Sequence, residues 1–409
     1  MRVCWFGTYE RDYPRNRIAI DGLARHGAQV VECHVEVWGL TRVKLRDYFR
    51  APSLARLAFR YLAALAVLTL RHARLGQYDV MVVGFNGHLD VPLAWLLTRL
   101  RRRPLVLDPL VSVYNTLVED KRFFAPNSFA ARAIVRLERW IYSLPDAIVT
   151  DTDAHRRYFA ERFGVPLAKL VTIHTGADDR VFHPFATRRL AGALRVLYYG
   201  KYLPLHGVRT MFEASKRLAG EDVTFTFIGR GDFADEARAV YGAARTRDVP
   251  HVTLIEWVPY EELPKLIEGA DVCLGIVGGT LKADLVMPNK AYQAFAMGKP
   301  LVTGASAAAR ELLGDEPCAV LVPMADAAAL ADALRALARD PLKRRWLGER
   351  AARAFRERWC LERIGERWLA LLEALARGER ELGVESQLEP EGGAIAGEKT
   401  LGQAMRREA

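Results

Sequence analysis

A strand–helix alternation that occurs twice is the feature that most constrains the fold of this chain. Nearly continuous apolar runs, typical of strands covered on both faces, alternate with longer runs of helical periodicity. The apolar runs lie at 2–6, 30–34, 80–84, 104–107, 147–150 and 169–174, then at 195–199, 223–228, 252–255, 271–276, 300–303 and 319–322. The helical runs lie at 17–26, 54–75, 91–101, 129–143 and 154–163, then at 208–218, 233–241, 259–268, 289–297, 307–313 and 327–339. This α/β rhythm predicts two Rossmann-like domains, each with a doubly wound parallel sheet.

The alternation breaks between Asp178 and Leu194, where proline, aromatic and basic residues replace it. A chain of 409 residues is long enough for two such domains. We therefore expect an N-terminal domain over 1–187 and a C-terminal domain over 195–345. One strong helical run follows over 341–377. Residues 378–409 are polar and lack periodicity, which predicts a disordered tail.

The net charge of +10 favours anionic partners, such as a nucleotide diphosphate or an anionic phospholipid surface. Nucleic acid is not expected, because the basic residues form no stripe interleaved with aromatic residues. The 5 cysteines have no metal-ligand spacing, and Cys4, Cys273 and Cys318 lie in apolar runs. We expect buried thiols, no metal and a cytoplasmic location. The chain begins directly with a strand pattern, so no signal peptide is expected.

The helical run at 54–75 has two interpretations. Its apolar core, Tyr61 to Leu70, is too short to span a bilayer and is flanked by arginines. It fits a buried helix of the first domain. It also fits an interfacial helix whose arginines contact anionic headgroups, which would place the protein peripherally on the inner face of the membrane.

Glycine turns and a helix start converge in the second half of the chain. Gly200-Lys201 follows one predicted strand, and Gly229 and Gly231 follow the next. Pro288 and Asn289 open a helix that carries Lys290 in its first turn. Free N–H groups and the helix dipole at such a start favour an anion. The pattern predicts a phosphate site.

These motifs resemble the family 4 retaining glycosyltransferases of the GT-B fold. Gly200-Lys201 and His206-Gly207 stand where that family carries Gly-Arg and Lys-Gly, and Ala296–Pro300 matches its Ala-Met-x-Gly-x-Pro helix end. The resemblance implies two domains that face a cleft and a C-terminal helix, over 346–377, that packs back on the first domain. It also implies a nucleotide-diphosphate sugar donor, retention of configuration and no metal or other cofactor. The acceptor stays unknown; the charge and the helix at 54–75 suit a lipid-linked one.

The resemblance implies roles for residues of the second domain. Lys201 and His206 would supply positive charge to the leaving diphosphate. Trp257 would either stack on the base or belong to the core. The family's paired glutamates are replaced by Leu285 and Gln293, although Gln293 retains the ability to hydrogen-bond a ribose hydroxyl. The donor site would comprise Gly200, Gly229, Gly231, Trp257, Asn289, Lys290 and Gln293.

The first domain offers candidates of its own. Gly7, Arg15 and Arg17 belong to the segment after the first strand, which in GT-B enzymes reaches across the cleft to phosphate and acceptor. Asp108 ends a strand on the acceptor side and is a catalytic candidate. Further acceptor-side candidates are His88, Tyr114, Asn115 and Asp120. The Asp-Thr-Asp at 151–153 resembles a metal motif, but we expect Asp153 to be a helix N-cap.

The sequence leaves three other functions open. A sugar-nucleotide epimerase can share this two-domain fold. A non-catalytic sugar-nucleotide or glycan-binding protein is suggested by Leu285 and Gln293. A nicotinamide dehydrogenase fits least, because the first turn lacks GxGxxG.

Overall fold

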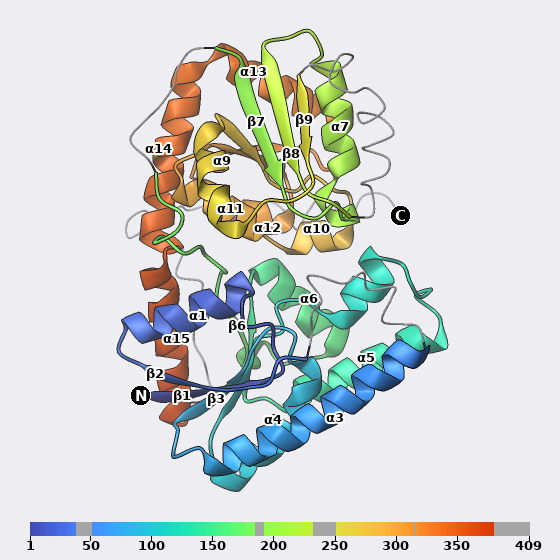
Figure 1. Ribbon diagram of the computed structural model, residues 1–409, viewed down its shortest axis with the longest axis vertical. Coiled ribbons are helices and arrows are strands. Elements are labelled where there is room, and N and C mark those ends of the chain that lie inside the picture. The colour runs from blue at the N-terminus through green and yellow to red at the C-terminus, as the bar shows by residue number, and fades with distance from the viewer. Residues whose placement is uncertain (38–50, 185–191, 232–250, 315, 380–409) are drawn as a thin grey trace, which may run out of the picture.

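The computed structural model describes residues 1–37, 51–184, 192–231, 251–314 and 316–379. They form two lobes, with the N-terminal lobe below and the C-terminal lobe above in Figure 1. The predicted helix at 233–241, most of the predicted tail and much of the predicted linker lie outside the described residues.

The N-terminal lobe is built on a six-stranded, all-parallel sheet with the strand order β2-β1-β3-β4-β5-β6. Its strands are β1 (Arg2–Gly7), β2 (Gln29–His34), β3 (Val80–Val83), β4 (Leu105–Leu107), β5 (Ala147–Thr150) and β6 (Leu170–Thr172). Its helices are α1 (Pro14–Arg25), α3 (Ala51–Arg74), α4 (Val91–Arg101), α5 (Phe129–Ser143), α6 (Asp153–Phe163) and a π-helical segment, η2 (Asn115–Asp120). Buried apolar residues of α3 to α6 share one core, and those of α1 share another. The sheet is therefore covered on both faces.

The C-terminal lobe has a second six-stranded parallel sheet, in the order β12-β11-β10-β7-β8-β9. The strands are β7 (Leu194–Tyr199), β8 (Val223–Ile228), β9 (Val252–Ile255), β10 (Val272–Leu274), β11 (Leu301–Gly304) and β12 (Ala319–Val322). The helices are α7 (Val208–Arg217), α9 (Leu263–Gly269), α10 (Leu281–Leu285), α11 (Asn289–Ala296), α12 (Ala307–Leu313) and α13 (Ala327–Arg339). The strand order reverses between β7 and β10. Ligands of doubly wound sheets bind beyond the strand ends at such a switch point.

The predicted C-terminal helix is two helices. α14 (Pro341–Arg358) packs on α11 in the C-terminal lobe, and α15 (Leu361–Ala376) packs on α1 in the N-terminal lobe. Figure 1 shows the pair running down one side of both lobes. The return to the N-terminal lobe thus occurs at Trp359–Cys360 rather than from residue 346. Trp359 is buried against Phe295, with ring centroids 5.4 Å apart, and this anchor ends the first helix.

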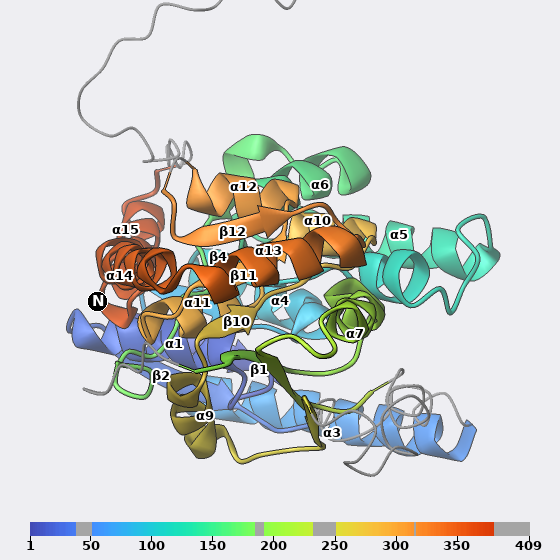
Figure 2. The same ribbon diagram turned by 90° about the horizontal axis from the view of Figure 1, so that it is seen from above.

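The lobes also meet on the side away from that crossing. Figures 1 and 2 both place α6 beside α12 and α10. Glu311 of α12 accepts hydrogen bonds from the amides of Asp153 (2.6 Å) and Ala154 (2.8 Å), the first residues of α6. Lys282 of α10 donates to Thr116 of η2 across 2.8 Å. These contacts fix how the strand ends of one lobe face those of the other.

Candidate functional site

The two predicted glycine turns pack backbone against backbone at the switch point of the C-terminal sheet. Gly200 follows β7 and Gly229 follows β8, both with positive φ. A β-carbon at Gly229 would lie 1.9 Å from the carbonyl oxygen of Gly200, so any other residue there would force the turns apart. Gly231 bridges to Tyr202 in the same arrangement. Both glycine turns therefore lie at one point, beyond the ends of β7 and β8.

Lys290 reaches that point from the first turn of α11. Its side chain is only 6% exposed, and Nζ lies 4.1 Å from the centre of the Tyr198 ring. A β-carbon at Gly200 would lie 2.9 Å from the same Nζ. In the part of the chain that the structure describes, Nζ has no hydrogen-bond partner. Desolvation lowers the pKa of Lys290 to about 7. An anion placed against this buried and unpartnered amine would stabilise its charged form.

Lys201 and His206 lie next to this ammonium but differ in charge. Lys201 is exposed, and desolvation lowers its pKa while the Glu10 carboxylate opposes that shift. Burial, with Lys290 nearby, lowers the pKa of His206 well below its usual value. Its Nδ1 lies 2.8 Å from the Tyr198 hydroxyl and in contact with the Lys201 carbonyl. His206 is therefore neutral near pH 7, which corrects the expectation that its positive charge would serve a diphosphate.

The N-terminal lobe contacts the same region through the loop after β1. The side chain of Tyr13 lies near the side chain of Asn289, which opens α11, and Asn289 opposes the rise in the pKa of Tyr13 that burial causes. Glu10, in the same loop, acts electrostatically on Lys201. No side chain caps the start of α11, where Pro288 holds the N-cap position. The loop therefore lies against the C-terminal lobe through Tyr13 and Glu10, whereas its reach to phosphate and acceptor through Gly7, Arg15 and Arg17 stays a prediction.

The positions that depart from the family pattern are both buried. The side chain of Gln293 lies near Tyr260 and opposes the rise in the pKa of Tyr260 that burial causes. Leu285 packs in a hydrophobic cluster that includes Ala154 of the other lobe, and its carbonyl accepts from Thr152 across 2.5 Å. Trp257, after β9, is 64% exposed and so is not a core residue. Of its two interpretations, only stacking on a ligand stays open.

Arg15 and Asp108 form a buried ion pair within the N-terminal lobe. Arg15 donates to both carboxylate oxygens of Asp108, at 2.8 and 3.1 Å, and to the carbonyl of Ile173 at 2.6 Å. Both side chains are almost fully buried. Arg17, two residues on, is exposed on α1. The pair lies between α1 and the end of β4, and its part in phosphate binding or catalysis stays a prediction.

Of the other acceptor-side candidates, His88 and Asn115 have partners within the N-terminal lobe, whereas Asp120 accepts a hydrogen bond from Thr280 of the C-terminal lobe across 3.3 Å. Burial lowers the pKa of His88 to about 4, and its Nε2 lies 3.1 Å from the Val111 carbonyl. Asn115 and Asp120 are the ends of η2, and Asn115 donates to Glu119 across 2.7 Å. The N-cap of α6 is Thr152, whose hydroxyl accepts from the His155 amide, and not Asp153. The sequence did not distinguish Thr152 from Asp153 as the N-cap, because threonine and aspartate both suit that position.

Two lobes that face each other, each built on a six-stranded parallel sheet, define a protein of the GT-B class. The model of the Glycosyltransferase Family 4 matches residues 17–181, and that of the Glycosyl transferases group 1 matches residues 193–340. The chain belongs to this family of group 1, family 4-like glycosyltransferases.

Curated relatives cover part of the chain. Glycogen synthase of Mycobacterium tuberculosis is 27% identical over 264 residues, which is 61% of this chain and 58% of the relative. Phosphatidyl-myo-inositol mannosyltransferase of Mycobacterium leprae is 30% identical over 219 residues, 51% of this chain and 54% of the relative. The chain thus spans just over half the length of these relatives.

Solved structures agree over nearly the whole fold. Sucrose-phosphate synthase of Thermosynechococcus elongatus superposes with a TM-score of 0.70 at 17% identity, covering 92% of this chain and 99% of that one. HepE of Anabaena, in complex with UDP and glucose, superposes with a TM-score of 0.64 at 14% identity, covering 91% and 99%. At these identities the likeness concerns the fold. Among the described helices, none has the length and apolarity needed to cross a membrane.

Proposed function

We propose that this protein is a glycosyltransferase that moves a sugar from a nucleotide-diphosphate donor to an acceptor held between the lobes. The observation that carries the proposal is the Lys290 ammonium, buried without a hydrogen-bond partner among the described residues and aimed at the Gly200 turn. A diphosphate there would supply the missing acceptor oxygens. The start of α11 and the exposed Lys201 would add favourable electrostatics.

In this scheme the residues act mainly on the leaving group. Breaking the bond between sugar and diphosphate builds negative charge on the diphosphate, and Lys290 and Lys201 stabilise that charge. Tyr13 of the other lobe lies near Asn289, so donor binding would be sensitive to how the lobes face each other. Neutral His206 contributes a hydrogen-bonding ring rather than charge. Retention of configuration and independence from metal are proposed from the family resemblance.

A thermal-shift screen with UDP, GDP and ADP, and with their sugar conjugates, tests the donor site. We expect one base to stabilise the protein, because ligands that bind only the folded state raise its melting temperature. Lys290→Ala and Lys201→Ala should each reduce the shift. A full shift in both variants, or no shift in the wild type, would reject the assignment.

A binding protein without turnover is the second candidate, favoured by Leu285 and Gln293. Leu285 is packed between the lobes where the family has a glutamate near the sugar. Release of free nucleotide from the sugar conjugate that binds best distinguishes the two functions. Gln293→Glu restores the carboxylate that the resemblance expects, and a gain in nucleotide affinity would support a ribose contact at this position.

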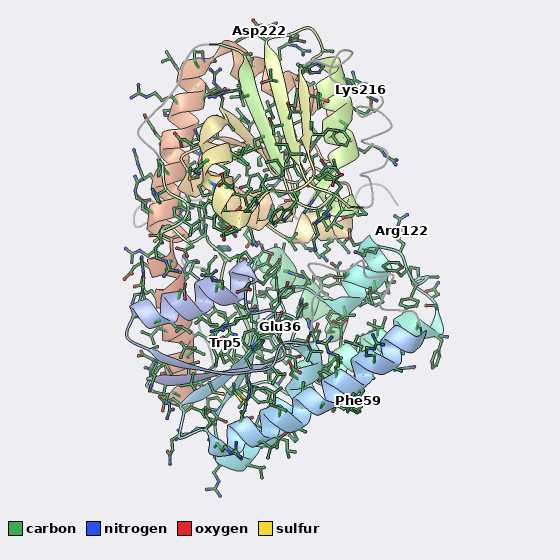
Figure 3. All side chains as sticks on the ribbon, in the orientation of Figure 1. Trp5, Glu36, Phe59, Arg122, Lys216 and Asp222 are labelled. Carbon is green, nitrogen blue, oxygen red and sulfur yellow. The ribbon has the colours of Figure 1, made fainter. Side chains whose placement is uncertain are left out.

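We also propose a lipid-linked acceptor and a peripheral position on the cytoplasmic face of an anionic membrane. The outward stripe of α3 supports this: Phe59 is 74% and Leu62 64% exposed, and Val67 and Leu70 are exposed on the same face. Figure 3 labels Phe59 on this helix. The exposed Arg56 belongs to the same helix. An exposed apolar stripe with arginines suits the boundary between headgroups and acyl chains.

Sedimentation with vesicles tests the membrane proposal. Wild-type protein should bind vesicles that contain phosphatidylglycerol, more weakly at high salt. Phe59→Ser with Leu62→Ser should abolish binding. Leu342→Ser, which removes an equally exposed leucine from the C-terminal lobe, is the matched control and should bind normally. Equal binding by the stripe variant would contradict the proposal.

A further inference from the structure

One buried carboxylate joins α3 to the loop that reaches the donor site. Asp90 accepts hydrogen bonds from the Thr8 amide at 2.6 Å and the Thr8 hydroxyl at 2.9 Å. The hydroxyl of Tyr61, on α3, donates to the other oxygen of Asp90 at 3.2 Å. Asp90 is fully buried. A displacement of α3 therefore acts on the carboxylate that holds Thr8.

Thr8 begins the segment that contacts the C-terminal lobe. A β-carbon at the preceding Gly7 would lie 2.5 Å from an Asp90 oxygen, so the loop and the carboxylate are in close contact at its start. Further along the loop, Glu10 acts electrostatically on Lys201, and Tyr13 lies near Asn289. The connection thus runs from α3, through Asp90, to two of the residues assigned to the donor site.

α3 contributes few buried side chains to the lobe. Of its described side chains, only Ala64, Leu68 and His72 are buried. A helix with so few buried apolar contacts belongs to the less stable parts of a fold. Burying the outward stripe in a bilayer would restrict the movement of α3 and, with it, the loop held through Asp90.

We infer that α3 couples an anionic membrane to the donor site: lipid contact on the outward stripe raises the affinity for a nucleotide diphosphate through Tyr61, Asp90 and Thr8. The inference rests on the proposed function and adds regulation of the same site. Ordering the loop before the nucleotide arrives lowers the entropy lost on binding. Because coupling is reciprocal, the nucleotide raises the affinity for vesicles by the same factor.

The test measures that factor directly and needs no acceptor. UDP affinity of the full chain is measured with phosphatidylcholine vesicles and with vesicles that also contain phosphatidylglycerol. If another nucleotide diphosphate gives the larger thermal shift, it replaces UDP. Vesicle binding is then measured with and without the nucleotide. We expect wild-type affinity to rise about fivefold or more with the anionic vesicles, the lower end of typical coupling.

Tyr61→Phe removes the hydroxyl and keeps the ring. It should bind vesicles and, in their absence, nucleotide like the wild type, but lose most of the increase. Tyr158→Phe, on α6, is the matched control, because it deletes a comparable hydroxyl, which donates to Glu119 across 2.8 Å. This variant should keep the increase in nucleotide affinity. An unchanged increase in Tyr61→Phe overturns the inference. The inference is also overturned if the wild type binds vesicles and nucleotide independently of each other. That result leaves the proposed function intact. A wild type that never binds nucleotide rejects both.

Discussion

The ammonium of Lys290 lies over the ring of Tyr198, with Nζ 4.1 Å from the ring centre, and it is the ring rather than an oxygen that faces this charge. A cation–π contact offsets part of the loss of hydration. The lowered pKa of Lys290, about 7, indicates that the offset is incomplete. This residue is therefore expected to cost stability and to contribute binding.

Lys290→Met should raise stability and weaken nucleotide binding together. Methionine is one atom shorter, fills most of the same space and removes the unpartnered charge, a gain of about 1–3 kcal/mol. The pKa of Lys290 in the folded state, about 7, lies below the usual lysine value of 10.5, so the folded state binds fewer protons between these two pH values. The loss of folding stability caused by the Lys290 charge in the wild type is therefore greatest below pH 7 and decreases as the pH rises towards 10.5.

Denaturant melts of wild type and Lys290→Met at several pH values measure this difference. Lys299→Met is the matched control, because Lys299 donates to the Glu268 carbonyl at 2.9 Å and its loss should destabilise. A Lys290→Met variant that is less stable than the wild type, or that binds nucleotide as tightly, would contradict the account.

Nucleotide diphosphate binding should be accompanied by proton uptake. Roughly one pH unit above its pKa, Lys290 is mostly neutral in the structure described here. A diphosphate placed against it favours the ammonium and raises the pKa, so a proton is taken up on binding. Calorimetry in two buffers with different ionisation enthalpies measures the number of protons. Lys290→Met should abolish the uptake, and an equal uptake in that variant would assign the proton to another group.

Much of the fold follows from the sequence because apolar runs and glycine turns are local signals. Each predicted strand is present in one of the two sheets, and Gly200, Gly229 and Lys290 do converge at a switch point. What could not be predicted depends on distant partners. The Arg15–Asp108 pair joins residues 93 positions apart. No proline or glycine marks the helix break at Trp359 in the sequence. The break coincides instead with the packing of Trp359 on Phe295, a contact between distant residues.

The charge of His206 illustrates the same limit within the site. Its position next to Gly207 indicated a phosphate contact, and a histidine in an exposed loop would titrate near its usual pKa. Desolvation and the nearby lysine hold it neutral instead. Burial and neighbouring charge are properties of the assembled lobe, so no local pattern around position 206 contains them.

Trp257→Ala should weaken nucleotide binding and leave stability nearly unchanged. The side chain is exposed, so truncation should alter the free energy of unfolding by only about 0.5 kcal/mol or less. Loss of stacking on a base typically costs about 1–3 kcal/mol. Trp346→Ala, which removes another exposed tryptophan from α14, is the control and should bind normally. Titration calorimetry with the preferred nucleotide decides between a stacking residue and an unrelated surface tryptophan.

Asp108 is where the catalytic and the structural roles can be separated most sharply. Asp108→Ala leaves the Arg15 guanidinium buried without its carboxylate, and losing one partner of a buried pair typically costs about 3–5 kcal/mol. Arg15→Met with Asp108→Leu removes both charges and should recover most of that loss in denaturant melts. If Asp108 only holds α1 against β4, this stable double variant should retain nucleotide binding and turnover. If Asp108 takes part in the reaction, the double variant should bind nucleotide normally and turn over no donor. A double variant as unstable as Asp108→Ala would show instead that the shape of the pair, and not its charge balance, supports the lobe.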